Sequence, residues 1–196
     1  MSLRNLSQVH WTPIAAALKA AHWLAERSST RVLDVGSGPG KFCIVGALST
    51  AGSFIGVEQR PGLTETARRA STLLGASRAA FVQGNMLDLD WDFFDAFYLY
   101  NPFNENVYPD SQIDQSVIHS QENYDRCIRL TQWNLEKAKF GTRVVTFHGF
   151  GGVMPNSYQL IRQEFIAEGP LQFWIKLPNA QLKANLKKES TSRSLQ

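Results

Sequence analysis

The residues with the clearest capacity for chemistry lie in a glycine-rich run at residues 32–40, Val-Leu-Asp-Val-Gly-Ser-Gly-Pro-Gly. Glycines directly after a strand allow a sharp turn and a close approach of the backbone to a ligand. Dinucleotide enzymes have G-x-G-x-x-G at such a turn, with a pyrophosphate at the start of the next helix. In this chain Gly36, Gly38 and Gly40 alternate instead. Lys41 occupies the place of the third dinucleotide glycine, so the pattern is not typical of a pyrophosphate site.

Two acidic residues accompany this turn. Asp34 comes just before it, where an acid suits an ammonium group better than a phosphate. Glu58 ends the second predicted strand, where its carboxylate can accept hydrogen bonds from both hydroxyls of a ribose. With the neighbouring Ser37 and Gln59, these residues predict a pocket for a positively charged nucleoside.

Alternating apolar segments predict the scaffold that positions these residues. Strands are expected at residues 31–35, 53–57, 79–83, 94–100 and 143–148, and helices at 12–27, 41–48, 63–74 and 124–138. Strands and helices of these lengths predict a doubly wound α/β fold with a mostly parallel, seven-stranded type of sheet and helices on both faces. Two further segments, 158–165 and 171–177, predict an antiparallel strand at one edge.

The first helix has local signals of its own. Thr12 is expected to cap it and Pro13 to occupy its first position. Ile14, Leu18, Ala21 and Ala25 fall on one face and predict the side that packs on the sheet. Trp11, just before the helix, either folds over the bound ligand or packs on the helix.

Length and composition indicate a single folded domain. With 196 residues and 43% apolar content, the chain can bury a core without disulfides or metals. We expect the domain to span residues 1–178 and residues 179–196 to be a disordered tail. That tail holds four basic residues and one acidic residue, which equals the formal net charge of +3. The body is therefore close to neutral.

Cysteine usage and hydropathy bear on metals and location. Cys43 and Cys127 are the two cysteines, and no segment has the ligand spacing of a metal site, so no metal is expected. The first thirty residues lack the apolar core of a signal peptide. No run approaches the roughly 20 apolar residues of a membrane span. We therefore expect a cytoplasmic protein.

In order and spacing, residues 32–40, 54–58 and 81–88 resemble the class I, Rossmann-like S-adenosylmethionine-dependent methyltransferases. The resemblance covers roughly residues 10–177 and implies S-adenosylmethionine as the cofactor. In that family the residue after the third strand contacts the adenine amino group, and the next side chain packs on the ring. These positions correspond to Asn85 and Met86. The family more often has aspartate at the first, but an asparagine oxygen can also accept that hydrogen bond.

The resemblance also implies an acceptor site after the fourth strand, at Asn101-Pro102-Phe103. The Asn101 side chain and the Pro102 carbonyl could accept hydrogen bonds from an amino group, and Phe103 could pack on the acceptor. This run resembles the Asn-Pro-Pro-aromatic motif of methyltransferases that act on amino nitrogens of adenine or glutamine, without its second proline. We therefore predict methyl transfer to an amino nitrogen of a protein or nucleic acid.

Other interpretations remain open at this point. Residues 36–41, residues 54–58 and the Asn-x-Phe-type loop also resemble non-SET lysine methyltransferases of the nucleosome core and bacterial relatives. The acceptor could instead be a small molecule. His148, at the end of the fifth strand, either relays a proton or only makes a structural hydrogen bond. A nicotinamide-dependent oxidoreductase and a non-catalytic cofactor-binding subunit are the alternatives outside this enzyme class.

Overall fold

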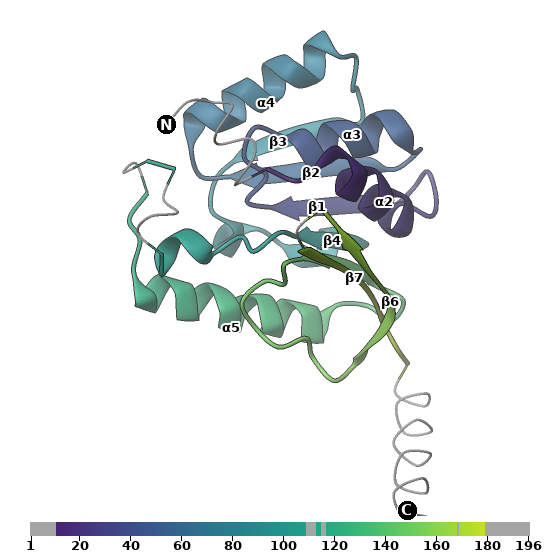
Figure 1. Cartoon of the computed structure of the whole chain (residues 1–196), viewed down its shortest axis with the longest axis vertical. Helices are drawn as coiled ribbons and strands as arrows, with labels where there is room; N and C mark the ends of the chain where they lie inside the picture. The colour runs from purple at the N-terminus through teal and green to yellow at the C-terminus, as the bar shows by residue number, and fades with distance from the viewer. Residues whose placement is uncertain (1–10, 109–112, 115–116, 168, 179–196) are drawn as a thin grey trace, which may run out of the picture.

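The computed structural model describes residues 11–108, 113–114, 117–167 and 169–178. Helices and strands alternate along most of this part of the chain (Figure 1). The helices are α2 (Ile14–Leu24), α3 (Lys41–Ser49), α4 (Pro61–Leu73) and α5 (Gln121–Lys137). The strands are β1 (Arg31–Val35), β2 (Ser53–Glu58), β3 (Ala79–Gln83), β4 (Ala96–Leu99), β5 (Arg143–Phe147), β6 (Tyr158–Ile166) and β7 (Gly169–Lys176). The tail predicted at residues 179–196 lies outside the described residues.

The strands of the described residues form one seven-stranded sheet in the order β3-β2-β1-β4-β5-β7-β6. From β3 to β5 all neighbours are parallel, whereas β7 is antiparallel to both β5 and the edge strand β6. The predicted doubly wound α/β fold is therefore confirmed, including the antiparallel strands at one edge. The chain order reverses between β1 and β4, and such sheets bind ligands outside the carboxyl ends of their strands at this point.

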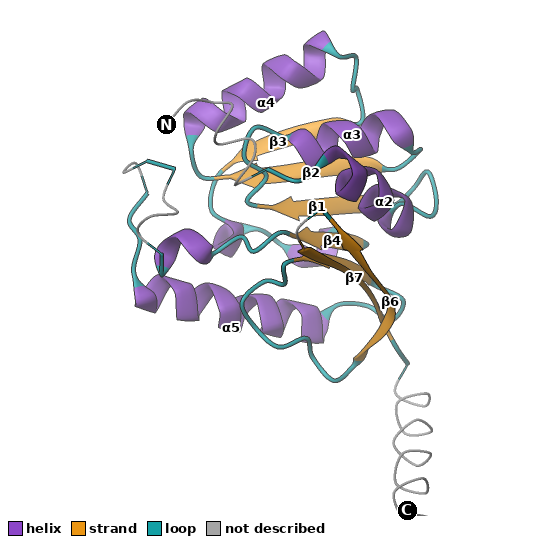
Figure 2. Ribbon diagram, viewed as in Figure 1, coloured by secondary structure: helices purple, strands orange, loops and turns teal. Residues whose placement is uncertain are grey.

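Helices cover both faces of the sheet (Figure 2). Apolar residues of α2, α3 and α4 pack in one core cluster, and those of α5 pack in a second. β1 contributes Val32 to the first cluster and Leu33 to the second, as expected for a central parallel strand that is covered on both sides. Among the described residues, no helix has the length and apolar character needed to cross a membrane.

The first helix is shorter than predicted, and its buried face agrees with the predicted one only in part. Of the predicted contact residues, Ile14 and Leu18 are exposed, Ile14 by 58%, whereas Ala21 is buried and Ala25 packs against the core. The buried side chains of α2 are mainly small: Ala16, Ala17, Ala20, Ala21 and Leu24. These small side chains let α2 lie close to the rest of the core, so the two larger residues were placed on the wrong side.

The predicted cap of this helix is also wrong. Pro13, not Thr12, occupies the position before the first helical residue, and no side chain caps the helix. The Thr12 hydroxyl instead shares a buried hydrogen bond of 3.0 Å with the Tyr98 hydroxyl at the end of β4. This bond attaches the start of the described chain to the middle of the sheet.

Candidate functional site

A cavity of about 440 Å³ lies at the carboxyl ends of the parallel strands. Its walls come from the loops after β1, β2, β3, β4 and β5, from the segment before α2 and from the first turns of α5. The predicted site residues that line it are Asp34, Gly36, Ser37, Gly38, Glu58, Gln59, Asn85, Met86, Asn101, Pro102 and Phe103. Segments from five strand ends thus converge on one space, as the topology requires.

The glycine turn is fixed to the end of β2 by hydrogen bonds. The backbone N–H groups of Gly36 and Ser37 both donate to the Val57 carbonyl at 3.0 Å. The Gly38 N–H donates to Oε2 of Glu58 at 3.1 Å. Because these donors are already satisfied within the protein, the turn holds its shape before any ligand enters.

Gly40 differs from the other two glycines, because it is not among the residues that line the cavity. It precedes the first residue of α3 with a φ of +81°, and a Cβ there would lie 2.5 Å from the Phe81 ring. Gly38 has a φ of +53°, but a Cβ there would meet only Trp11, with Nε1 at 3.6 Å. Gly40 therefore serves helix packing, and Gly38 faces the cavity.

This difference predicts opposite outcomes for two matched substitutions. Gly40→Ala should lower the free energy of unfolding by about 2–4 kcal/mol, because it adds a clash with a core ring to the strain of a positive φ. Gly38→Ala should cost about 1 kcal/mol of stability but weaken ligand binding about tenfold. Urea unfolding and calorimetric titration of both variants measure these effects. Equal stability losses would contradict the assignment.

Asp34 lies deep in the cavity and is 4% exposed. Burial raises the pKa of its carboxyl group to about 7, although a hydrogen bond from the Cys43 thiol at 3.5 Å acts in the opposite direction. The charge of Glu58 raises the pKa further. A buried acid of this kind gains its charge most readily when a cation binds beside it.

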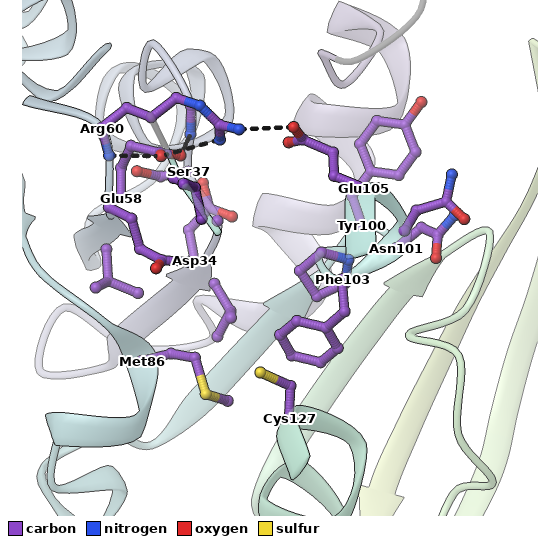
Figure 3. A pocket seen from close by; sticks show the side chains of 18 of the residues that line it. Asp34, Ser37, Glu58, Arg60, Met86, Tyr100, Asn101, Phe103, Glu105 and Cys127 are labelled. Atoms are coloured by element: carbon purple, nitrogen blue, oxygen red, sulfur yellow. Dashed lines mark hydrogen bonds and ion pairs between the residues drawn. The ribbon is translucent and has the colours of Figure 1, made fainter. Parts of the chain in front are cut away.

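Glu58 and Arg60 form a buried pair beside the glycine turn (Figure 3). Oε1 of Glu58 accepts the backbone N–H of Arg60 at 2.9 Å and lies 3.6 Å from its guanidinium. Burial raises the pKa of the Glu58 carboxyl group, and the N–H groups of Arg60 and Gly38 together with the Arg60 charge act against this. The carboxylate is thereby held in one orientation at the cavity wall.

Arg60 was not predicted from the sequence, yet it connects two walls of the cavity. Its guanidinium donates to Glu105 at 2.6 Å (Figure 3) and to Asp114 at 3.1 Å, and both acids follow β4 in the chain. Its side chain is 7% exposed, and these carboxylates raise its pKa. A single arginine in a polar segment gives no signal in the sequence, because its partners lie 45 and 54 residues away.

Asn85 and Met86 lie beside each other after β3. The Asn85 side-chain oxygen accepts the Leu87 N–H at 3.0 Å, and its amide group donates to Gln59 at 3.4 Å. Met86 is buried in the same core cluster as Phe103. Polar and apolar walls for a planar group are therefore present at the predicted positions.

Asn101 adopts a left-handed backbone conformation at the end of β4, with a φ of 38°. Its N–H donates to the Gly149 carbonyl at 2.9 Å, so the ends of β4 and β5 are joined. Non-glycine residues in this conformation are strained and cluster at functional sites. Pro102 approaches the glycine turn, since a Cβ on Gly36 would lie 3.4 Å from its Cβ.

The aromatic residues beside Asn101 differ in exposure. Phe103 is only 4% exposed, and its ring points toward Cys127 and the core (Figure 3). Tyr100 is only partly buried, and it stacks on His148 with ring centroids 5.7 Å apart. Both Tyr100 and His148 line the cavity. Sequence spacing alone did not reveal this pair, because it joins the ends of two strands.

Several buried polar atoms on the cavity wall have no hydrogen-bond partner among the described residues. They are Nε1 of Trp11, Oγ of Ser37 and both ring nitrogens of His119. An unsatisfied buried polar group costs about 1–3 kcal/mol, so its presence needs an explanation. A bound ligand that supplies the missing hydrogen-bond partners would explain it. Elsewhere in the described ranges, no three His, Cys, Asp or Glu residues gather in a way that could hold a metal ion.

Comparison with known proteins identifies the family. A family model described as "Methyltransferase domain" matches residues 26–168, which is more than half of the chain. No curated protein matches the sequence. An RNA methyltransferase from Salinibacter ruber, crystallised with S-adenosyl-L-homocysteine, has the same fold with a TM-score of 0.64. It is 20% identical, and the similarity covers 86% of this chain and 94% of that chain.

Two further structures have the same fold but act on different acceptors, according to their names. The Bacillus subtilis M1A22 tRNA methyltransferase TrmK has a TM-score of 0.56 and 13% identity, over 86% of this chain and 68% of that chain. The mitomycin 7-O-methyltransferase MmcR has a TM-score of 0.58 and 13% identity, over 83% of this chain and 53% of that chain. Together with the family match, these findings show that the chain belongs to the methyltransferase domain family and is an S-adenosylmethionine-dependent methyltransferase of the class I fold.

Proposed function

We propose that the predicted residues hold S-adenosylmethionine in two halves. Asp34 binds the ammonium group of the methionine half, and the free N–H of Trp11 and the ammonium of Lys41 bind its carboxylate. The support is that all three residues line the cavity, that Asp34 is a buried acid, and that the Trp11 N–H has no partner among the described residues. Opposite charges on ligand and protein then match at both groups.

The nucleoside half lies, in this proposal, beside Glu58, Asn85 and Met86. Glu58 accepts hydrogen bonds from the ribose hydroxyls, because each carboxylate oxygen retains a free lone pair after its bond to the backbone. Asn85 and Met86 contact adenine, with Gln59 beside Asn85. Gly36, Ser37 and Gly38 give the backbone its close approach.

This placement predicts a pH dependence of cofactor binding. Because the pKa of Asp34 in the free protein is about 7 and binding of an ammonium needs the ionised form, binding below pH 7 must release a proton. The affinity for S-adenosylhomocysteine should fall about tenfold for each pH unit between pH 7 and pH 5. Calorimetry in buffers of different ionisation enthalpy measures the released proton. An affinity that is constant over this range would contradict the role of Asp34.

We propose that the methyl acceptor is an amino nitrogen of a nucleic acid or a protein. The observation that carries this proposal is the position of Asn101, whose backbone is fixed to the end of β5 while the residue lines the cavity. The Asn101 side-chain oxygen and the Pro102 carbonyl accept hydrogen bonds from the amino group, and Tyr100 offers a partly exposed ring beside it. The RNA and tRNA methyltransferases among the structures of the same fold favour a nucleic acid.

The chemistry that the protein must perform is mainly orientation. When bound, S-adenosylmethionine supplies a methyl group that is already activated on a sulfonium. Asn101 and Pro102 then need to aim the lone pair of the amino nitrogen along the line of displacement and exclude water. Family membership favours this reaction over the oxidoreductase and the non-catalytic alternatives.

Labelling of a cell extract with radioactive S-adenosylmethionine tests the acceptor class. The purified protein is added to the extract, which is then separated into RNA, DNA, protein and small molecules. Label in a macromolecular fraction that depends on the added protein supports the proposal. The mitomycin enzyme, which has the same fold, acts on a small molecule according to its name. Label that appears only in the small-molecule fraction would therefore contradict the proposal. A variant with Asn101 replaced is the matched control.

A further inference from the structure

His119 lies just before α5 and is not assigned by the family pattern. Its side chain is 8% exposed, and it lines the cavity. Neither ring nitrogen has a hydrogen-bond partner among the described residues, and the nearest acid, Oε2 of Glu105, is 3.8 Å from Nε2. That oxygen already accepts from Arg60 and from the Ile113 N–H at 2.9 Å. His119 is therefore a buried ring with both polar atoms unused.

A chain of contacts connects His119 to Glu58. From His119 the chain runs to Glu105, from Glu105 to Arg60, and from Arg60 to Glu58. Arg60 thus joins the carboxylate proposed for the ribose to the wall that carries His119. Asn123 and Arg126, one and two turns along α5, line the cavity on the same helix. In the placement proposed above, the methionine half lies instead beside Asp34, Trp11 and Lys41.

The two ring nitrogens of His119 have no hydrogen-bond partner among the described residues, and they indicate which groups a ligand has to offer. A neutral imidazole has one N–H donor and one acceptor. The edge of adenine offers an amino donor beside a ring-nitrogen acceptor, and a ribose hydroxyl can both donate and accept. The amino-acid half also has a donor and an acceptor, but the placement proposed above assigns its ammonium to Asp34 and its carboxylate to Trp11 and Lys41. The nucleoside is therefore the half that has donors and acceptors left for His119.

We propose that His119 binds the nucleoside half of S-adenosylmethionine by hydrogen bonds, on the wall that Arg60 connects to Glu58. This inference rests on the cofactor placement proposed above. It adds a residue from the segment between β4 and α5 to a site that the sequence pattern assigned to the loops after β1, β2 and β3. His119 then contacts the nucleoside from the wall that follows β4, which Arg60 connects to Glu58.

Two ligands and two variants separate this role from others. S-adenosylhomocysteine contains both halves, whereas 5′-methylthioadenosine lacks the amino-acid half. His119→Phe keeps an aromatic ring but removes both nitrogens, and we expect about tenfold weaker binding of both ligands. Trp11→Phe, the matched control for the amino-acid half, should weaken S-adenosylhomocysteine about tenfold and leave methylthioadenosine within about twofold. His119→Asn, which retains polar atoms, should recover part of the loss. Calorimetric titration measures all these affinities.

The stability of the variants distinguishes binding from a structural role. Since His119 makes no hydrogen bond to the described residues in the free protein, His119→Phe should unfold at the same temperature as the natural chain or a higher one. A lower unfolding temperature with unchanged affinity would overturn the inference. So would an unchanged affinity for methylthioadenosine accompanied by lost turnover, because His119 would then serve the acceptor.

Glu58→Gln tests the underlying placement separately. If this variant weakens methylthioadenosine and His119→Phe does not, the inference on His119 is wrong and the cofactor placement stands. If Glu58→Gln leaves methylthioadenosine binding intact, the nucleoside lies elsewhere and both proposals are wrong. No acceptor is present in these titrations, so an error in the proposed acceptor class does not affect their outcome.

Discussion

Replacing Asp34 with asparagine is expected to weaken the binding of S-adenosylhomocysteine at least about 100-fold while making the free protein more stable at pH 8. The first effect follows because a neutral amide cannot neutralise the ammonium group of the ligand. The second follows because the pKa of the buried carboxyl group is raised by burial from 3.8 to about 7. Asparagine has no charge to bury, and its side-chain oxygen can still accept from Cys43.

The sign and the pH window of the stability gain follow from proton binding. In the unfolded chain Asp34 loses its proton near pH 3.8, whereas in the folded protein it keeps the proton up to about pH 7. The unfolded state binds fewer protons between these values, so the free energy of unfolding falls as pH rises through this window. The loss is complete above pH 7 and amounts to about 4 kcal/mol. The Asp34→Asn variant has no carboxyl group to ionise, so it does not lose this stability.

Urea unfolding at pH 4.5 and pH 8, together with calorimetry at pH 8, tests the Asp34 prediction. The variant should exceed the natural chain in stability by up to about 4 kcal/mol at pH 8 and by much less at pH 4.5. A variant that loses both binding and stability at pH 8 would show that Asp34 is needed for the fold. Asp95, an acid that is about 40% exposed and pairs with Arg31, provides a control position where asparagine should change neither property by much.

Asn101→Gly should reduce turnover about 100-fold or more and leave the affinity for S-adenosylhomocysteine within about twofold. The reason is that glycine keeps the left-handed backbone of residue 101 but removes the side-chain oxygen that is proposed to orient the amino group. Single-turnover kinetics with the labelled acceptor fraction and calorimetry with the cofactor product measure the two effects.

Asn101→Ala is the matched companion of this variant. It removes the same side chain but adds the cost of a positive φ, so it should lose about 1 kcal/mol of stability relative to glycine. If the role of Asn101 is chemical, both variants lose turnover to the same extent. If glycine retains full turnover and alanine does not, only the backbone turn matters, and the acceptor role of the side chain is wrong.

The sheet could be predicted closely from the sequence because its signals are local. β1 and β2 are short apolar runs that end at the glycine turn and at Glu58, and parallel strands buried on both faces read as such runs. The packing face of α2 could be predicted only in part, because its contacts are made mainly by alanines, which leave little contrast between one face and another. Thr12 shows the same limit, since its partner Tyr98 is 86 residues away.

The same distinction between local signals and distant contacts decides which residues of the candidate site could be predicted. Asp34 and Glu58 could be predicted, because each stands at a fixed offset from the glycine turn, and the structure brings both to one cavity. Arg60 and His119 could not be predicted, because their placement depends on contacts with Glu105, which follows β4. Gly40 matched the glycine pattern, yet its position is set by the Phe81 ring. Sequence spacing therefore predicts the glycine turn, whereas the remaining walls of the cavity depend on tertiary contacts.

The hydrogen bond between Thr12 and Tyr98 ties the segment before α2 to the sheet beside the cavity. Tyr98 also stacks on Phe42 of α3 with ring centroids 3.8 Å apart, so a change at residue 12 is transmitted to the helix that follows the glycine turn. Shortening the protein through position 12 would therefore remove Trp11 and Thr12 from the cavity wall and leave the Tyr98 hydroxyl without its partner inside the core.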